Sequence, residues 1–157
     1  MEQRIGEALK KTTNGLYIIG SKYGDSVNAM TAVWLTRLSF TPQLLGVAIG
    51  NTRFSHNMIE RSGVFSVSVL GPDQIALSRH FGLQSGRDTD KFVDIPYITK
   101  VTGAPILQTA LAYLDCKVVS HHETGDHTLF VGEVLDGAVW SETEPAIYKK
   151  KEIFGNG

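Results

Sequence analysis

The pattern that most constrains this chain is a series of short segments in which apolar and polar residues alternate, separated by turns. Residues 64–70, with the sequence VFSVSVL, follow this alternation most cleanly and predict a strand with one buried face. Residues 112–122 and 128–139 flank the polar turn Glu123-Thr124-Gly125-Asp126 and predict a hairpin of two strands. The chain is therefore expected to form an antiparallel sheet.

Three more strands are predicted upstream of this hairpin. Residues 16–20 and 44–49 are short and apolar, and residues 21–26 are expected to form a polar hairpin loop. Residues 27–39 predict one longer strand with apolar side chains on both of its faces. We expect one face of this strand to lie in the core and the other to contact a ligand or a second subunit.

The predicted helices are few and short. Residues 1–11 have an amphipathic pattern, and a second helix is expected to begin at Ser55 as its N-cap and to end at Gly63. Residues 74–81 predict a third helix, whereas the basic tail from Tyr148 has no clear pattern. Six or seven strands with two or three short helices indicate a mainly β barrel or sandwich. The sequence has no GxGxxG or GxxxxGK[ST] motif, which argues against a Rossmann or P-loop nucleotide site.

Composition limits the class of protein. A chain of 157 residues fits one domain, residues 1–157, and 42% hydrophobic with 20% charged residues is normal for a soluble globular protein. The net charge of -1 gives no reason to expect a nucleic acid or an anionic membrane as partner. No apolar run approaches the ~20 residues of a membrane span, and the N-terminus does not resemble a signal peptide. These observations predict a cytoplasmic location.

The segment NAMTAVW, residues 28–34, mixes small, hydroxyl and large apolar side chains within a predicted strand. Small residues let a flat ligand approach the backbone, and unpaired N–H groups of a strand can hydrogen-bond its edge. The alternative is an ordinary strand in which the threonines are common β-formers.

The segment GNTRFSH, residues 50–56, combines a tight turn, hydroxyl groups, Arg53 and a helix N-terminus. These groups suit a phosphate, since free N–H groups and an arginine both donate to its oxygens. The alternative is plain helix capping, with Arg53 in solvent. In residues 85–92, Arg87 and Lys91 could reach the same phosphate and be held by Asp88 or Asp90; alternatively, this charged loop is only solvated.

Histidines and the single cysteine give weaker signals. His127 follows Gly125 and Asp126 at the entry of a strand, where it could contact a nicotinamide nucleotide or donate a proton, or simply be a surface histidine. His121 and His122 are adjacent and point to opposite faces of a strand, so no metal site is expected. Cys116 is alone in the chain, which excludes an internal disulfide, and it lies in an apolar strand that predicts burial.

Several motifs occur in the order found in one known family. They are Thr36-Arg37-Leu38-Ser39, Pro42-Gln43-Leu44, Asn51 to Ile59, SGRDTDKF (85–92) and GDHTLFVGEV (125–134), and they follow the NAMTAVW segment. Together they resemble the flavin reductase-like, FMN-binding split-barrel family, including its flavoredoxin-type and ferric-reductase-type members, over most of residues 14–140. Gln43 departs from the second proline of many members, and the tail matches nothing in the family pattern.

The resemblance implies a six-stranded antiparallel Greek-key split barrel with a few short helices, assembled as a homodimer. It implies FMN as cofactor, with FAD as the alternative, and NAD(P)H as co-substrate. The ring of the flavin would contact the segment Asn28, Met30, Thr31, Ala32, Val33 and Trp34. The ribityl chain and phosphate would contact Ser39, Asn51, Thr52, Arg53 and His56, with Lys91 and Phe92 nearby. His127 is the candidate for the nicotinamide nucleotide.

The implied activity is that of an NAD(P)H-dependent flavin reductase that passes electrons to an acceptor. One alternative is a flavoredoxin-like electron carrier that keeps FMN bound and takes its electrons from a redox partner protein. Others are a ferric reductase and a split-barrel binding or sensing protein without redox turnover. The sequence leaves open NADH against NADPH, the acceptor, and whether the flavin is a resident cofactor or a substrate.

Overall fold

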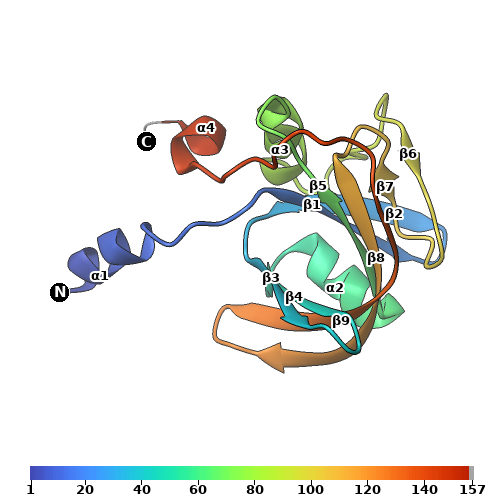
Figure 1. Cartoon of the computed structure of the whole chain (residues 1–157), viewed down its shortest axis with the longest axis horizontal. Helices are drawn as coiled ribbons and strands as arrows, with labels where there is room; N and C mark the ends of the chain where they lie inside the picture. Colours follow the sequence, from blue (N-terminus) through green and yellow to red (C-terminus); the bar gives the residue numbers. More distant parts are fainter. Residues whose placement is uncertain (156–157) are drawn as a thin grey trace.

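The computed structural model describes residues 1–155 and consists of a strongly curved antiparallel sheet with helices on its outside (Figure 1). The main sheet contains β1 (Tyr17–Tyr23), β2 (Ser26–Ala32), β3 (Leu35–Ser39), β4 (Leu44–Gly50), β5 (Val64–Val69), β8 (Ala112–Glu123) and β9 (His127–Val139). A small separate hairpin pairs β6 (Tyr97–Ile98) with β7 (Ile106–Leu107). The helices are α1 (Glu2–Leu9), α2 (Phe54–Ser62), α3 (Ile75–Gly82) and α4 (Lys150–Phe154).

The order of strands in the main sheet explains how it closes. The order is β2-β1-β5-β8-β9-β4-β3, so β2 and β3 are its two edges. Only Val33 and Trp34 lie between these strands in the chain, which forces the two edges of the sheet together. The carbonyl of Trp34 accepts a hydrogen bond of 2.9 Å from the N–H of Ala48, while β2 itself pairs with no strand of residues 1–155 on that side. We call this gap between β2 and β4 the seam.

This architecture confirms the predicted mainly β split barrel, although its main sheet has seven strands instead of the six that the resemblance implied. It also corrects two details of the predicted strands. Residues 27–39 do not form one strand, because the chain leaves one edge of the sheet at Val33 and joins the other edge at Leu35. The polar residues 21–23 belong to β1 rather than to a loop, since Ser21 pairs with Asn28 and the turn is confined to Gly24 and Asp25.

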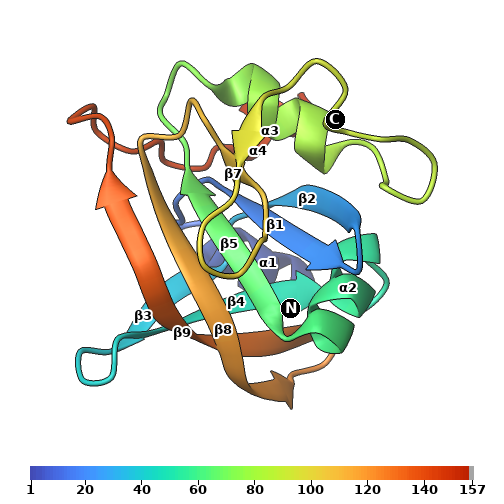
Figure 2. The ribbon, with the colours of Figure 1, turned by 90° about the vertical axis from the view of Figure 1, so that its right-hand side faces the viewer.

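Two apolar cores hold the barrel together. Figure 2 shows the curved sheet that encloses the first and α3, which lies above the sheet over the second. The barrel interior contains buried side chains from six strands and from α2, among them Ile19, Val47, Ile49, Ile59, Phe65, Val67 and Phe130. A second core lies between the outside of the sheet and α3, and contains Ile18, Leu70, Phe81, Leu107 and Ile153. Cys116 lies in the first core as predicted, and burial, with a smaller contribution from Asp115, raises the pKa of its thiol to about 12.

The helix ends differ from the prediction at one point. Gly63 ends α2 in the left-handed conformation, with φ of 72° and its N–H bonded to the carbonyl of Ile59. At the start of α2, however, Arg53 occupies the N-cap position and Ser55 lies in the first turn. The hydroxyl of Ser55 instead accepts a hydrogen bond of 2.9 Å from Asn28 Nδ2, which ties α2 to β2.

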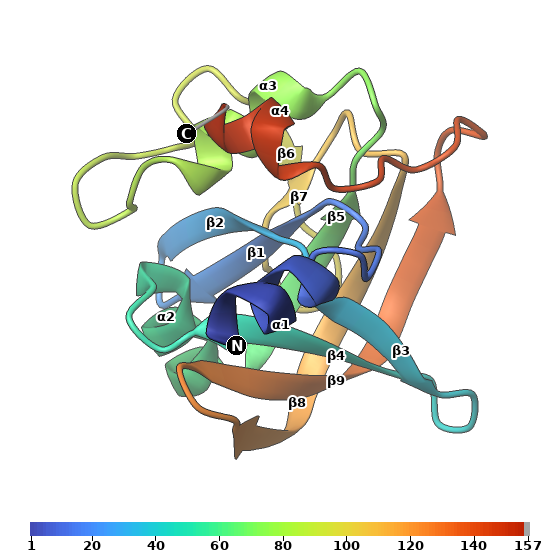
Figure 3. The same ribbon diagram turned by 90° about the vertical axis from the view of Figure 1, so that its left-hand side faces the viewer.

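The C-terminal tail has a defined path that the sequence did not predict. Its backbone bonds to the body of the protein through Ala146 N–H to the Leu70 carbonyl and Tyr148 N–H to the Asn14 carbonyl. The tail then forms α4 beside α3 (Figure 3). Within α4, Ile153 is buried. In contrast, α1 buries none of its residues. No helix within residues 1–155 is long and apolar enough to cross a membrane.

Candidate functional site

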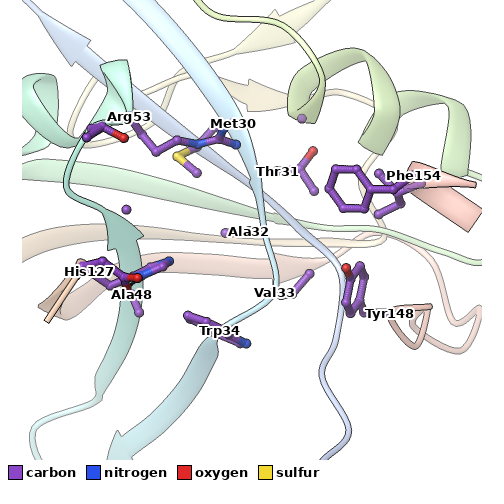
Figure 4. Close-up of a pocket in the computed structure, with 15 residues that line it drawn as sticks. Met30, Thr31, Ala32, Val33, Trp34, Ala48, Arg53, His127, Tyr148 and Phe154 are labelled. Carbon is purple, nitrogen blue, oxygen red and sulfur yellow. Dashed lines mark hydrogen bonds and ion pairs between the residues drawn. The ribbon is translucent and has the colours of Figure 1, made fainter. Parts of the chain in front are cut away.

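A cavity of about 430 Å³ opens along the seam, and we call it the seam pocket. Residues 30–34 form one wall, the turn after β4 forms the opposite wall, and the tail closes a third side (Figure 4). Its lining is Met30, Thr31, Ala32, Val33, Trp34, Ala48, Gly50, Thr52, Arg53, Gly82, Asp126, His127, Tyr148, Ile153 and Phe154. The pocket therefore lies along the edge of β2 that is not hydrogen-bonded to a neighbouring strand, and a ligand in the pocket would contact this edge.

The walls of the seam pocket are mostly apolar and leave the backbone accessible. The small side chains of Ala32 and Ala48 face the cavity from opposite sides of the seam. Since β2 is an edge strand, alternate N–H and C=O groups along it point away from β1. A flat heterocycle with hydrogen-bonding groups along one edge matches this surface in shape and in chemistry.

His127 and Trp34 stand together at one end of the seam pocket. Their ring centroids are 4.6 Å apart with the planes inclined by 48°. The Nδ1 atom of His127 lies 2.6 Å from Oδ1 of Asp126, and the imidazole is 29% exposed. At the other end, Figure 4 shows Tyr148 near Val33 and Phe154 near Thr31.

A second cavity, of about 460 Å³, adjoins the seam pocket and shares four lining residues with it: Met30, Thr52, Arg53 and Gly82. We call it the cationic pocket, because Arg53, Arg87 and Lys91 all line it. Within residues 1–155, none of these three side chains lies within 4.0 Å of a carboxylate. The N-terminus of α2 also opens here, through Phe54 and Ser55. This excess of positive charge and free N–H groups suits a phosphate.

Lys91 is an unusual component of this pocket because it is only 4% exposed. Its Nζ donates hydrogen bonds to the carbonyls of Ala29 at 2.8 Å and Phe81 at 2.9 Å. An ammonium has three N–H donors, so one remains for a ligand. Burial lowers the pKa of Lys91 to about 8, and the positive charge of Arg53 contributes to the shift. An anion in the cationic pocket would offset both effects.

The structure brings most of the predicted site residues to these two pockets. Thr31, Ala32, Val33, Trp34 and His127 line the seam pocket, Asn28 and Lys91 line the cationic pocket, and Met30, Thr52 and Arg53 line both. This grouping joins residues from β2, from the β4–α2 turn, from the loop after α3 and from the start of β9.

Ser39, Asn51, His56 and Phe92 lie on neither pocket wall. Ser39 lies in β3 and pairs with Leu44 of β4. Phe92 packs between the rings of Phe81 and Tyr97. Asn51 and His56 are joined to one another through Thr128. Asp90, expected to hold Arg87 or Lys91, instead accepts the N–H of Phe92. These side chains bond or pack within the structure near the pockets and do not line them.

Other lining residues were missing from the predicted set. Ser85 and Gly86 line the cationic pocket beside Arg87, which the sequence had already indicated, and a Cβ on Gly86 would collide with Oδ1 of Asn28. The charges of this loop were visible in the sequence, but the close approach that needs glycine was not. Tyr148, Ile153 and Phe154 come from the tail, whose only signal was an apolar pair among lysines.

The sequence matches the family model described as "Flavin reductase like domain" over residues 9–157. A curated relative, the ferric-chelate reductase (NAD(P)H) of Archaeoglobus fulgidus, is 32% identical over 153 residues, covering 96% of this chain and 90% of the relative. A high molecular weight rubredoxin of Moorella thermoacetica is 35% identical over 144 residues, covering 90% of this chain. This chain spans only 63% of that longer relative.

Solved structures agree with these sequence matches. The NADH:FAD oxidoreductase SgcE6 of Streptomyces globisporus superposes with a TM-score of 0.87 at 27% identity, covering 94% of this chain and 89% of SgcE6. SgcE6 has also been solved in complex with NAD and FAD fragments, with a TM-score of 0.85. An FMN-binding protein from Thermus thermophilus matches with a TM-score of 0.81 at 32% identity over 90% of this chain and 85% of its own. By sequence and by fold, the chain belongs to the flavin reductase-like family.

Proposed function

We propose that this chain is an NAD(P)H-dependent flavin reductase that binds FMN across the seam pocket and the cationic pocket. The observation that carries this proposal is the adjacency of the two pockets. One is largely apolar and bordered by the edge strand β2, and the other holds Arg53, Arg87 and Lys91 with no carboxylate partner among residues 1–155. FMN has the same division, with a flat ring system joined to a phosphate by a polar chain.

The proposed roles follow from position. The edge of β2 and residues 33–34 would bind the ring system, largely through backbone groups, and Arg53, Arg87 and Lys91 would bind the phosphate. Asn28 and Thr52 would lie beside the linking chain. FMN, when bound, supplies a centre that accepts hydride and releases electrons one or two at a time. The protein would position it and tune its electrostatics.

His127 is proposed to contact the nicotinamide nucleotide. It lies at the rim of the seam pocket, is partly exposed and is backed by the aromatic face of Trp34. A nucleotide that approaches the ring system from solvent would meet this pair first. The similar overall fold of SgcE6, which has been solved in complex with NAD and FAD fragments, supports a nicotinamide nucleotide as the ligand.

Two measurements test the proposed function. FMN added to the purified protein should be retained with a perturbed visible spectrum, and anaerobic mixing with NADH or NADPH should bleach its absorbance. A protein that takes up no FMN during titration would overturn the proposal. The acceptor can then be sought among free flavins and ferric chelates, because reduced flavin reduces ferric chelates without a dedicated iron site.

A second candidate is an electron carrier that is reduced by a partner protein. The match to a longer rubredoxin-type relative favours this alternative, since the chain spans only 63% of that protein. Stopped-flow mixing of the FMN-loaded protein with NADH separates the two candidates. Rapid direct bleaching supports the reductase, and reduction only through a partner protein supports the carrier.

We also propose that residues 1–157 form a single domain that works as a homodimer in the cytoplasm, where NAD(P)H is supplied. Large exposed apolar side chains at the two ends of β3, Trp34 at 51% and Phe40 at 74% exposure, favour burial against a second copy. Sedimentation of the FMN-loaded protein as a monomer would contradict the dimer.

A further inference from the structure

Two predicted site residues that lie outside the pockets, Asn51 and His56, belong to one continuous chain of hydrogen bonds. Nε2 of His56 lies 2.8 Å from Oγ1 of Thr128, and Oγ1 of Thr128 lies 2.9 Å from Oδ1 of Asn51. Nδ2 of Asn51 then donates to the carbonyl of Gly125 at 3.1 Å. We call this series the His56–Gly125 chain. It runs from α2 to the turn between β8 and β9.

The direction of every bond in this chain is fixed by its last acceptor. The carbonyl of Gly125 can only accept, so the side chain of Asn51 must turn its NH₂ group toward it. Oδ1 of Asn51 then faces Thr128 and must receive the single hydroxyl proton. The oxygen of Thr128 can only accept from His56, so Nε2 of His56 must carry a proton. The other ring nitrogen, Nδ1, lies 3.5 Å from Oε2 of Glu60.

The surroundings leave these side chains little freedom. Thr128 is only 4% exposed, and the ring of His56 packs edge-on against Phe130 at 5.2 Å between centroids. The backbone N–H of Asn51 also bonds to the carbonyl of Asp126 at 2.9 Å. Asn51 thus holds two successive residues of the turn, Gly125 through its side chain and Asp126 through its backbone.

The residue that follows these two is His127. The other side of the turn is held by Thr124, whose N–H and hydroxyl both bond to the carbonyl of His127. The carboxylate of Asp126, by contrast, is 96% exposed and gives the imidazole only a solvent-exposed contact. The orientation of His127 in the seam pocket therefore depends on the turn, and the turn depends on Asn51.

We propose that Asn51, Thr128 and His56 are positioning residues, which hold the turn at Gly125–Asp126 so that His127 is presented to the nicotinamide nucleotide. This inference rests on the proposed contact between His127 and the nucleotide. It assigns to Asn51 and His56 an indirect role, through the turn, in place of direct contact with the flavin. It also adds Thr128, whose hydroxyl is the central link.

A double-mutant cycle tests this inference with the FMN-loaded protein. Thr128→Val keeps the shape of the side chain but removes the hydroxyl, and should raise the KM for NADH about 3- to 10-fold with kcat less affected. Thr128→Ser restores the hydroxyl and should return the KM toward wild type. The Kd for FMN, measured by fluorescence titration, should change less than about twofold in Thr128→Val. Combining Thr128→Val with His127→Ala should add nothing to the KM of His127→Ala alone.

The outcomes are distinguishable. If His127→Ala leaves the KM unchanged, the proposed nucleotide contact fails, and this inference fails with it. If His127→Ala raises the KM while Thr128→Val does not, or if the two effects multiply, only the positioning role is overturned. Long-range ¹H–¹⁵N NMR of the wild-type protein gives an independent check if Thr128→Val does not fold. The neutral His56 ring should carry its proton on Nε2, and a proton on Nδ1 alone would overturn the inference.

Discussion

The indole of Trp34 and the imidazole of His127 face each other across the seam, with ring centroids 4.6 Å apart. Trp34 comes from the two-residue link between β2 and β3, and His127 is the first residue of β9. Neither element alone could create this pair. The rim of the seam pocket therefore exists only when the barrel is closed.

The aromatic pair predicts the effect of replacing Trp34. Trp34→Ala should raise the KM for NADH about 3- to 10-fold, because the imidazole loses the ring against which it rests. Trp34→Phe retains an aromatic face and should show a smaller change. Steady-state kinetics with NADH measure both variants. An unchanged KM in Trp34→Ala would mean that the pair has no part in nucleotide binding.

Arg87 provides a test of the cationic pocket. Its Nη1 bonds to the carbonyl of Thr52 at 3.0 Å, and the guanidinium lies 5.6 Å from the centre of the Phe54 ring. Arg87→Ala should weaken FMN binding by about tenfold or more, since a charge-assisted bond to phosphate is lost. Riboflavin, which has no phosphate, should bind the variant and the wild type alike. Arg61→Ala, on α2 but outside both pockets, is the matched control.

The lowered pKa of Lys91 predicts a pH dependence of FMN binding. Only the protonated amine attracts phosphate, so affinity should fall as the pH rises through the Lys91 pKa of about 8. Bound phosphate favours the protonated form, so binding near this pH should take up protons. Titration of FMN by fluorescence from about pH 7 to about pH 9 measures the effect.

Two controls isolate the contribution of Lys91. Riboflavin should show no comparable fall in affinity, and Lys91→Met should bind FMN more weakly but without the pH dependence. A fall of equal size for FMN and riboflavin would place the titrating group elsewhere.

Two neighbouring residues of the tail are expected to affect different properties, one the stability of the fold and the other the affinity for FMN. Ile153 is 5% exposed in the second core, so Ile153→Ala should lower the free energy of unfolding by about 2–4 kcal/mol. Phe154 is 54% exposed and lines the seam pocket, so Phe154→Ala should alter FMN affinity with little loss of stability. Urea denaturation of the flavin-free protein and FMN titration distinguish the two effects. Equal loss of stability in both variants would contradict the assigned packing.

Gly20 predicts a severe packing defect. A Cβ at this position would collide with the carbonyl oxygen of Pro105 and with Oγ of Ser66, and backbone cannot move aside cheaply. Gly20→Ala should therefore destabilise the fold by about 2 kcal/mol or more. Gly6→Ala, where no atom lies within 4 Å, should be neutral or slightly stabilising. Thermal denaturation compares them, and similar melting temperatures would refute the packing argument.

The sequence predicted the parts of the fold that depend on local pattern. The alternation in β5 and the turn between β8 and β9 were visible because side-chain period and turn chemistry act over a few residues. The break at Val33-Trp34 was not visible, since it reflects which edge of the sheet each half joins. Apolar residues occur on both sides of the break, Met30 and Ala32 in the buried part of β2 and Leu35 and Leu38 in the largely exposed β3, and this continuity concealed the change of strand.

In the candidate site, too, the local sequence predicted some residues, whereas others are placed by contacts between distant parts of the chain. Residues 28–34 and 50–53 could be proposed from small and cationic side chains close together in sequence. The indirect placement of Asn51 and His56 depends on Thr128, more than seventy residues away from each. The contribution of Tyr148 and Phe154 depends on where the tail crosses the barrel. Such long-range placements leave no local pattern in one sequence.

The unpaired side of β2 has a consequence for the protein without its ligand. A free strand edge is a template onto which another chain can add, and this one lies beside apolar walls. Two features of the fold protect this edge from pairing with another chain. The short Val33-Trp34 link holds β4 close to β2, and the tail covers the approach from the other side. Loosening either barrier should therefore increase aggregation of the flavin-free form before it unfolds the barrel. The same gap that is proposed to bind a flavin would then admit a foreign strand.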